Sequence, residues 1–290
     1  MLLPAYWQVG RPQTGALQIL LCIGCEMKSD NPYLQLAIAA AKEAGRIQKA
    51  HFGESNQVEY KGEINPVTEV DRRCERAVVQ MIQDAFSDHD IMTEETPFEG
   101  RGAPWRWIVD PLDGTTNYFH GYPCFAVSIG LEVEGEMKLG VAYDPILDEL
   151  FRAEKGGGAF LNGRRIYVSR TDTLDRSFLC TGFPYDIREN VDLYLGYFRH
   201  FMIKSFAIRR PGSAVLDLCN LAAGRFDGFW ELKLHAWDVA AGSLLVTEAG
   251  GKVTGLSGQP FSIYSSEVVA SNGLIHEEML QAIREIQPSA

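Results

Sequence analysis

The chain has 290 residues, of which 46% are hydrophobic and 22% charged, so it can bury a sizeable core as one large domain or as two halves that share an interface. Its formal net charge is -11, and such an acidic chain lacks the cations that would neutralise a nucleic-acid backbone. Composition therefore argues against DNA or RNA as the main partner. An anionic ligand would bind most readily through metal cations, because these can reverse the sign of a local field.

The six cysteines, at positions 22, 25, 74, 124, 180 and 219, are scattered, and most lie in apolar surroundings. This distribution is typical of buried, reduced thiols and predicts a cytoplasmic protein. Cys22 and Cys25 form a lone C-x-x-C without a second pair, which disfavours a zinc site.

The beginning of the chain contains one apolar run, residues 16–25, which is too short to span a bilayer. A signal peptide would need a basic start, and only Arg11 is available. A second methionine follows at Met27, so we expect translation to begin there. Residues 1–27 would then be an N-terminal extension outside the fold, and residues 28–290 would form the domain, with no membrane attachment.

Helix and strand patterns mix along the rest of the chain. Apolar side chains at helical spacing predict helices over residues 32–51, 68–86, 213–223 and 237–249. Apolar runs separated by short turns predict strands over residues 106–110, 124–133, 138–143, 150–153 and 159–161. The class is therefore α+β or layered α/β, in two halves of approximately residues 28–145 and 146–290, without the strict alternation of a nucleotide-binding fold.

The most informative stretch is residues 107–117, which read WIVDPLDGTTN. An apolar strand carries Asp110 to its end, where Pro111 is expected to stop the pairing. Asp110 and Asp113 can then converge just beyond the sheet edge, with the hydroxyl of Thr115 close by. A lone pair of aspartates in a loop is often only a turn former, because the side chain hydrogen-bonds locally.

Three further acids favour a metal site over that structural explanation. Glu94 follows an apolar strand-like pair, whereas Asp71 and Asp238 each stand where a helix begins. Each helix-start acid could instead stabilise the helix dipole. Together the acids form a set of hard oxygen ligands without histidine or cysteine, which suits Mg²⁺ and not Zn²⁺. If they converge, they cannot all ionise at neutral pH without cations.

The chain resembles the inositol monophosphatase family from about residue 31 to its C-terminus. Two motifs carry the resemblance: residues 107–117, followed by Tyr118 where phenylalanine is usual, and residues 237–242, which read WDVAAG. The resemblance implies a layered αβαβα sandwich, usually a homodimer. It also implies Mg²⁺-dependent, lithium-sensitive hydrolysis of a phosphate monoester, above all myo-inositol monophosphate, by water that two metal ions activate.

The resemblance also assigns roles to single residues. The implied metal ligands are Glu94, Asp110, Asp113, Asp238 and the backbone carbonyl of Leu112. The implied catalytic residues are Asp71, Thr115 and Glu94, of which the first two would orient the attacking water. The implied substrate-binding residues are Gly114, Thr115, Gly212, Ser213, Ala214, Glu231 and Asp238. Lys61 matches a lysine near the active-site loop, and Lys233 could add positive charge at the substrate rim.

Two alternatives remain open. Relatives with the same kind of metal site cleave fructose 1,6-bisphosphate, histidinol phosphate, NADP or nucleotide bisphosphates, although the short link between Glu94 and Trp107 favours a monophosphatase. Residues 209–213, which read RRPGS, also resemble a bacterial subgroup that binds transcription or ribosome-assembly machinery. Such a partner is possible, but nothing else in the sequence indicates it.

A chain that begins at Met27 is expected to be as active and as thermally stable as the full-length chain. The reason is that the preceding residues carry no helix cap, no strand-pairing pattern and no usable signal. The measurement compares melting temperature and phosphate-ester hydrolysis for the two chains. A large drop in melting temperature after truncation would show that the N-terminal residues dock on the domain.

Overall fold

The computed structural model describes residues 31–54, 58–60 and 66–286. The predicted N-terminal extension and Lys61 lie outside these residues. Within them, no helix combines the length and the apolar character needed to cross a membrane.

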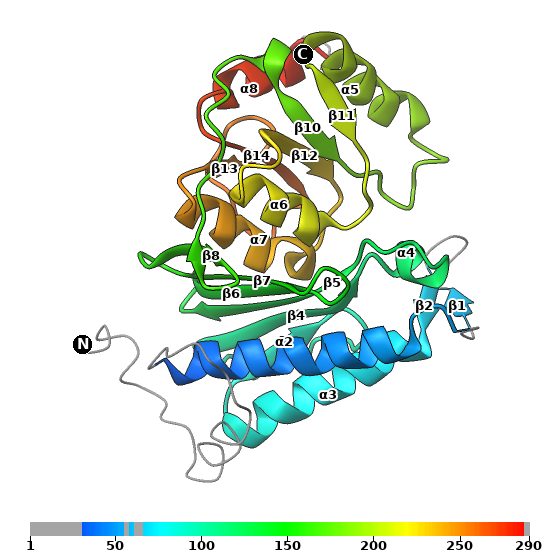
Figure 1. The fold of residues 1–290 in the computed structure, drawn as a ribbon, viewed down its shortest axis with the longest axis vertical. Coiled ribbons are helices and arrows are strands. Elements are labelled where there is room, and N and C mark those ends of the chain that lie inside the picture. Colours follow the sequence, from blue (N-terminus) through cyan, green and yellow to red (C-terminus); the bar gives the residue numbers. More distant parts are fainter. Residues whose placement is uncertain (1–30, 55–57, 61–65, 287–290) are drawn as a thin grey trace.

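The first layer consists of α2 (Pro32–His51) and α3 (Glu69–Ala85), which lie side by side on one face of a large sheet (Figure 1). Asn31 caps α2, because its Oδ1 accepts hydrogen bonds from the N–H groups of Tyr33 and Leu34. The helices predicted over residues 32–51 and 68–86 are thus confirmed to within one residue at each end.

The second layer is a seven-stranded sheet in the order β3-β4-β5-β6-β7-β8-β9. Its neighbours pair antiparallel, except that β3 and β4 are parallel. The strands are β3 (Asp90–Thr93), β4 (Trp105–Asp113), β5 (Ala126–Val133), β6 (Glu136–Asp144), β7 (Glu149–Glu154), β8 (Gly158–Leu161) and β9 (Arg164–Arg165). A separate antiparallel pair, β1 (Val58–Tyr60) with β2 (Pro66–Thr68), lies near the short helix α4 (Thr115–Phe119).

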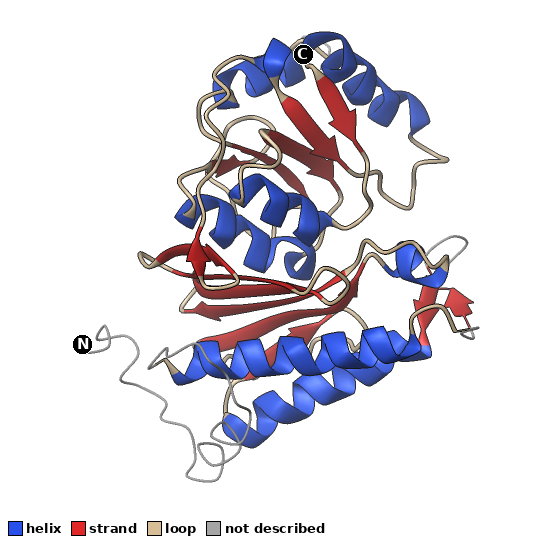
Figure 2. Cartoon of the chain, in the orientation of Figure 1, coloured by secondary structure: helices blue, strands red, loops and turns tan. Residues whose placement is uncertain are grey.

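The remaining layers come from the second half of the chain. Helices α6 (Ala214–Ala222) and α7 (Ala236–Glu248) cover the other face of the large sheet. The five-stranded sheet beyond them has the order β11-β10-β12-β14-β13, and its outer face carries α5 and α8 (Figure 2). The bounds are β10 (Phe178–Thr181), β11 (Ala207–Arg209), β12 (Gly228–Leu232), β13 (Lys252–Thr254), β14 (Glu267–Ser271), α5 (Val191–Lys204) and α8 (His276–Arg284), with a 3-10 turn at Leu174–Arg176.

Three clusters of buried apolar side chains hold these layers together. Trp107 and Ile108 are neighbours on β4, yet they belong to the first and second clusters, because successive side chains of a strand face opposite sides of the sheet. The third cluster lies beneath α5 and α8, where Phe201 stacks on Trp230 with ring centroids 4.2 Å apart. The order helix, sheet, helix, sheet, helix confirms the expected αβαβα sandwich.

The expectation that pairing stops at Pro111 is wrong, because β4 continues through this proline to Asp113. Asp110 pairs with Ser128 and Asp113 with Ala126, so β4 has one residue more than β5 between these two pairs. Such a β-bulge leaves one residue unpaired and therefore tolerates a proline, which has no N–H to donate. Without the bulge, residues three apart on a strand would face opposite sides of the sheet. The bulge is therefore what allows Asp110 and Asp113 to converge.

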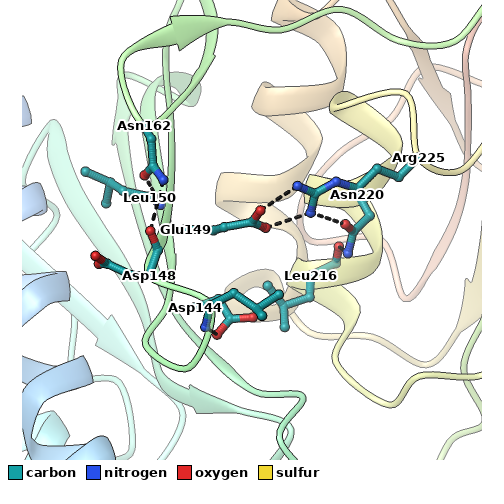
Figure 3. Close-up of polar contacts among 9 residues, drawn as sticks. Asp144, Asp148, Glu149, Leu150, Asn162, Leu216, Asn220 and Arg225 are labelled. Atoms are coloured by element: carbon teal, nitrogen blue, oxygen red, sulfur yellow. Dashed lines mark hydrogen bonds and ion pairs between the residues drawn. The ribbon is translucent and has the colours of Figure 1, made fainter.

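An ion pair fastens the end of α6 to the large sheet (Figure 3). The guanidinium of Arg225, just beyond α6, binds both carboxylate oxygens of Glu149 on β7, with Nη1 2.6 Å from Oε2. The same Nη1 donates to Oδ1 of Asn220 at 2.9 Å, and Nδ2 of Asn220 donates to the carbonyl of Leu216 at 2.8 Å. This bidentate ion pair holds α6 against the sheet at the end opposite the candidate site.

Candidate active site

The bulged end of β4 brings two carboxylates beneath the N-termini of the inner helices. Asp110 is buried, and its Oδ1 accepts a hydrogen bond of 2.9 Å from the N–H of Leu112. Asp113 reaches α6, where its Oδ2 accepts hydrogen bonds from Ser213 Oγ at 2.6 Å and from the N–H of Val215 at 2.8 Å. The two predicted aspartates are thus anchored by backbone groups before any ligand is present.

A third carboxylate completes the cluster. Asp238 stands in the first turn of α7, and one carboxylate oxygen from each of Asp110, Asp113 and Asp238 lies within 4.8 Å of the other two. Asp238 also caps α7, because its Oδ2 accepts a 2.7 Å hydrogen bond from the N–H of His235. The helix-start explanation therefore holds for this residue, and its place in the trio is compatible with a metal ligand.

The charges of this trio oppose one another. Burial raises the pKa of Asp110 well above its usual range, and the nearby charges of Glu94, Asp113 and Asp238 raise it further. Burial also raises the pKa of Asp238, and the charge of Asp113 adds to the effect. The pKa of Asp113 is raised by burial too, although its hydrogen bonds from Ser213 and Val215 oppose the shift. A cation placed among these oxygens would remove the repulsion.

The donor set fits a hard divalent cation. The trio offers only oxygen atoms, which match the preference of Mg²⁺, and no thiolate or imidazole that would favour zinc. Glu94 lies outside the trio but lines the same cavity, and its charge acts on Asp110. Leu112 also lines this cavity, and its backbone carbonyl oxygen lies 3.0 Å from Thr115 Oγ1. All the predicted ligands therefore line one cavity.

Asp71 and Thr115 meet although they are 44 residues apart in the chain. Thr115 Oγ1 lies 2.9 Å from Oδ1 of Asp71 and 3.0 Å from the carbonyl oxygen of Leu112. The single hydroxyl proton can be donated to only one of these acceptors at a time. The hydroxyl oxygen can also accept a hydrogen bond, for example from a water molecule. Asp71 is buried at the start of α3, and its contact with Thr115 links it to the site.

The predicted substrate-binding residues line a cavity of about 510 Å³ next to the carboxylate trio. These are Gly114, Thr115, Gly212, Ser213, Ala214, Glu231 and Asp238. Gly114 begins α4 with φ 93°, and a Cβ there would lie 2.8 Å from the carbonyl oxygen of Cys124, so only glycine fits. Glu231 also lines the cavity, and burial raises its pKa to about 8.

The sequence analysis did not predict two charged residues of the cavity wall. Arg210 lies in the wall, and its charge opposes the rise that burial causes in the pKa values of Asp113 and Glu231. Asp217 lies on α6, one turn after Ser213, and that helical spacing was the signal that could have revealed it. The expected positive charge of Lys233 is at the rim of the cavity, but its ammonium pairs with the carboxylate of Asp186.

Comparisons with known proteins agree with this geometry. The sequence profile of the inositol monophosphatase family matches residues 29–288. The chain is 39% identical to "Fructose-1,6-bisphosphatase/inositol-1-monophosphatase" of Aquifex aeolicus, over 89% of this chain and 97% of that protein. It is 42% identical to "Nus factor SuhB" of Pseudomonas aeruginosa, over 87% and 96%. A solved Thermotoga maritima IMPase superimposes with a TM-score of 0.81 at 38% identity, over 88% and 97%.

A five-layer sandwich with an acidic cluster at the end of its large sheet defines a class of proteins with an oxygen-lined site suited to a cation. The profile match over nearly the whole chain is more specific, and the chain belongs to the inositol monophosphatase family. The phosphatase activity that the two sequence motifs predicted is confirmed by this membership.

Replacing Thr115 with alanine is expected to lower kcat by about 10²- to 10⁴-fold while Mg²⁺ and substrate still bind, because the hydroxyl would no longer help orient the attacking water. Asp71→Asn should act similarly. Since the two side chains contact each other, the double variant should be little worse than either single variant. The measurements are kcat, KM and Mg²⁺ affinity by calorimetry. If Thr115→Ala raises only KM, the hydroxyl holds the substrate instead.

Proposed function

We propose that this protein hydrolyses myo-inositol monophosphate to inositol and phosphate, with Mg²⁺ as its cofactor. The observation that carries the proposal is the trio of carboxylates in a cavity whose wall also holds Glu231. A phosphate group fits beside the trio once cations neutralise the carboxylates, and a polyol fits beside Glu231. The relatives and solved structures that the chain resembles include inositol monophosphatases.

Each protein group has one task in this proposal. Glu94, Asp110, Asp113, Asp238 and the carbonyl of Leu112 would hold the cations. When bound there, Mg²⁺ lowers the pKa of the attacking water and stabilises charge on the leaving oxygen. Asp71 and Thr115 orient that water and take up its proton, and the backbone around Gly114 supports the phosphate. Water attacks in line, so no covalent phosphoenzyme is needed, and catalysis depends on positioning and electrostatics.

The remaining substrate contacts are placed by α6 and β12. Ser213 and Ala214 begin α6, so they bring the helix N-terminus to the cavity, and Gly212 precedes them. Glu231 accepts hydrogen bonds from inositol hydroxyls. A cytoplasmic location belongs to the same proposal, because Cys74, Cys180 and Cys219 are buried free thiols, which suit a reducing compartment.

Activity should disappear in excess chelator and return with Mg²⁺, because the carboxylate trio repels an anionic substrate without cations. Ca²⁺ should substitute poorly, since it prefers larger and looser coordination. Lithium should inhibit. The measurement is phosphate release from myo-inositol 1-phosphate, fructose 1,6-bisphosphate and other monoesters. Full activity in excess chelator would refute the metal assignment, and a clear preference for the bisphosphate would refute the substrate assignment.

A second candidate role is binding of transcription machinery, favoured by the 42% identity to a protein named a Nus factor. Asp110→Asn separates the two roles. The substitution should abolish turnover by weakening the metal site, whereas a binding role would survive it.

We also propose that two copies of the chain associate through α5 and the start of β11. Phe206 and Ile203 are 76% and 67% exposed there, next to the exposed Met202. The strand β11 is also an edge of the five-stranded sheet, and it is open to a partner on one side. A second copy of this chain would cover these apolar side chains.

The change Phe206→Asp together with Ile203→Asp is expected to convert a dimer into a monomer, because two charges would be buried in an apolar contact. The measurement is the molar mass in solution by analytical ultracentrifugation. Leu147→Asp provides a matched control, since Leu147 is 64% exposed on the turn between β6 and β7. A dimer that persists in the double variant, or a monomeric parent protein, would contradict this interface.

A further inference from the structure

Two more acids line the same cavity as the metal-site trio. Asp217 on α6 and Glu231 on β12 both line the cavity, and they are only 1% and 8% exposed. Oδ1 of Asp217 is buried and has no hydrogen-bond partner among the residues that the structure describes. A buried carboxylate oxygen without a partner is costly, so this position calls for an explanation.

The helix geometry explains why Asp217 points into the cavity. Ser213 caps α6 and is already committed to Asp113 through its hydroxyl. Asp217 follows one turn later, and its N–H donates to the carbonyl of Ser213 at 3.0 Å. Residues four apart lie on the same face of a helix, so Asp217 lies on the same face of α6 as Ser213, whose hydroxyl binds Asp113.

Glu231 approaches from the five-stranded sheet. It lies near the end of β12. A Cβ at Gly182 would come within 2.1 Å of its Oε1, so a side chain at position 182 would clash with this carboxylate. The charge of Glu231 acts on Asp217, so the two acids are neighbours. The two side chains therefore belong to the same part of the cavity wall.

The nearby cation does not satisfy these oxygens. Burial raises the pKa values of both acids, the charge of Arg210 only opposes this shift, and its Nη2 donates to the backbone carbonyl of Phe183 at 3.1 Å. The cavity wall thus holds two buried carboxyl groups beside a positive charge. What it lacks is a donor that can hydrogen-bond both acids without carrying a full charge, and hydroxyl groups meet this requirement.

We propose that Asp217 is a specificity-determining residue that accepts, together with Glu231, hydrogen bonds from hydroxyl groups on the alcohol part of the substrate. This inference rests on the proposed phosphatase function and deepens it. The trio at Asp110, Asp113 and Asp238 serves the phosphate, which every substrate shares. The pair at Asp217 and Glu231 serves the polyol, so it selects polyol phosphates over esters that lack hydroxyls.

The test uses the full-length protein with Mg²⁺ and two substrates, myo-inositol 1-phosphate and p-nitrophenyl phosphate, which has no free hydroxyl. Asp217→Leu removes both acceptor oxygens at similar size. It should raise KM for the inositol ester about 10- to 100-fold, as expected for a lost hydrogen bond to an acid. Hydrolysis of p-nitrophenyl phosphate should change less than about threefold, because no hydrogen bond is lost. Asp217→Asn keeps one acceptor oxygen and should restore most of the preference.

Asn220→Ala is the matched control, because Asn220 lies on the same helix but turns toward Arg225 and Glu149 instead of the cavity (Figure 3). It should leave the ratio of the two kcat/KM values unchanged. Melting temperature separates a binding role from a structural one. Asp217→Leu should melt no lower than the parent protein, because replacing an unpartnered buried polar group by an apolar one of the same shape is neutral or stabilising.

Two results would overturn the inference while leaving the proposed function standing. In the first, Asp217→Leu leaves the ratio of the two kcat/KM values unchanged in an active enzyme. In the second, it slows both substrates equally and lowers the melting temperature, which would show that Asp217 only supports α6. If the parent protein hydrolyses neither ester with Mg²⁺, the proposed function fails and this inference fails with it.

Discussion

The carboxylate of Asp113 at the end of β4 accepts hydrogen bonds from Ser213 and from the backbone of Val215 at the start of α6. These contacts join the first half of the chain to the second at the wall of the cavity. The N-terminus of a helix stabilises negative charge, so α6 and Asp113 support each other. The Arg225–Glu149 ion pair holds the other end of the same helix against β7. With both ends fixed, α6 can place Ser213 and Asp217 along one wall.

The site is built from groups that destabilise one another. Burial and mutual repulsion raise the pKa values of Asp110, Asp113 and Asp238, so the folded chain holds these carboxylates ionised only at a free-energy cost. Divalent cations would convert this repulsion into attraction, which explains how an acidic chain can bind an anionic substrate. Local strain of this kind is typical of functional sites, where stability is sacrificed for preorganisation.

The cavity wall combines two groups of acids. The trio suits cations and phosphate, whereas Asp217 and Glu231 lie near Asp113 and near the charge of Arg210. A phosphate monoester likewise combines an anionic group with an alcohol. The rim carries less positive charge than the sequence suggested, since Lys233 is paired with Asp186. Discrimination between substrates would therefore come from hydrogen bonds inside the cavity.

Local sequence signals determined the main helices, most strands and the chemical character of the site. Asn31 and Pro32 marked the start of α2, and the residues from Trp107 to Asn117 identified a site of oxygen ligands. These features depend on neighbours in the chain, so a pattern can reveal them. Membership of the family followed from the motifs for the same reason.

Only the tertiary structure decided how the pieces meet. The bulge that carries β4 past Pro111 depends on register with β5, and the contact of Asp71 with Thr115 joins residues 44 positions apart. The burial of Asp217 Oδ1 without a hydrogen-bond partner among the described residues depends on how α6 packs between two sheets. Such features follow from the packing of distant segments, which local periodicity does not encode.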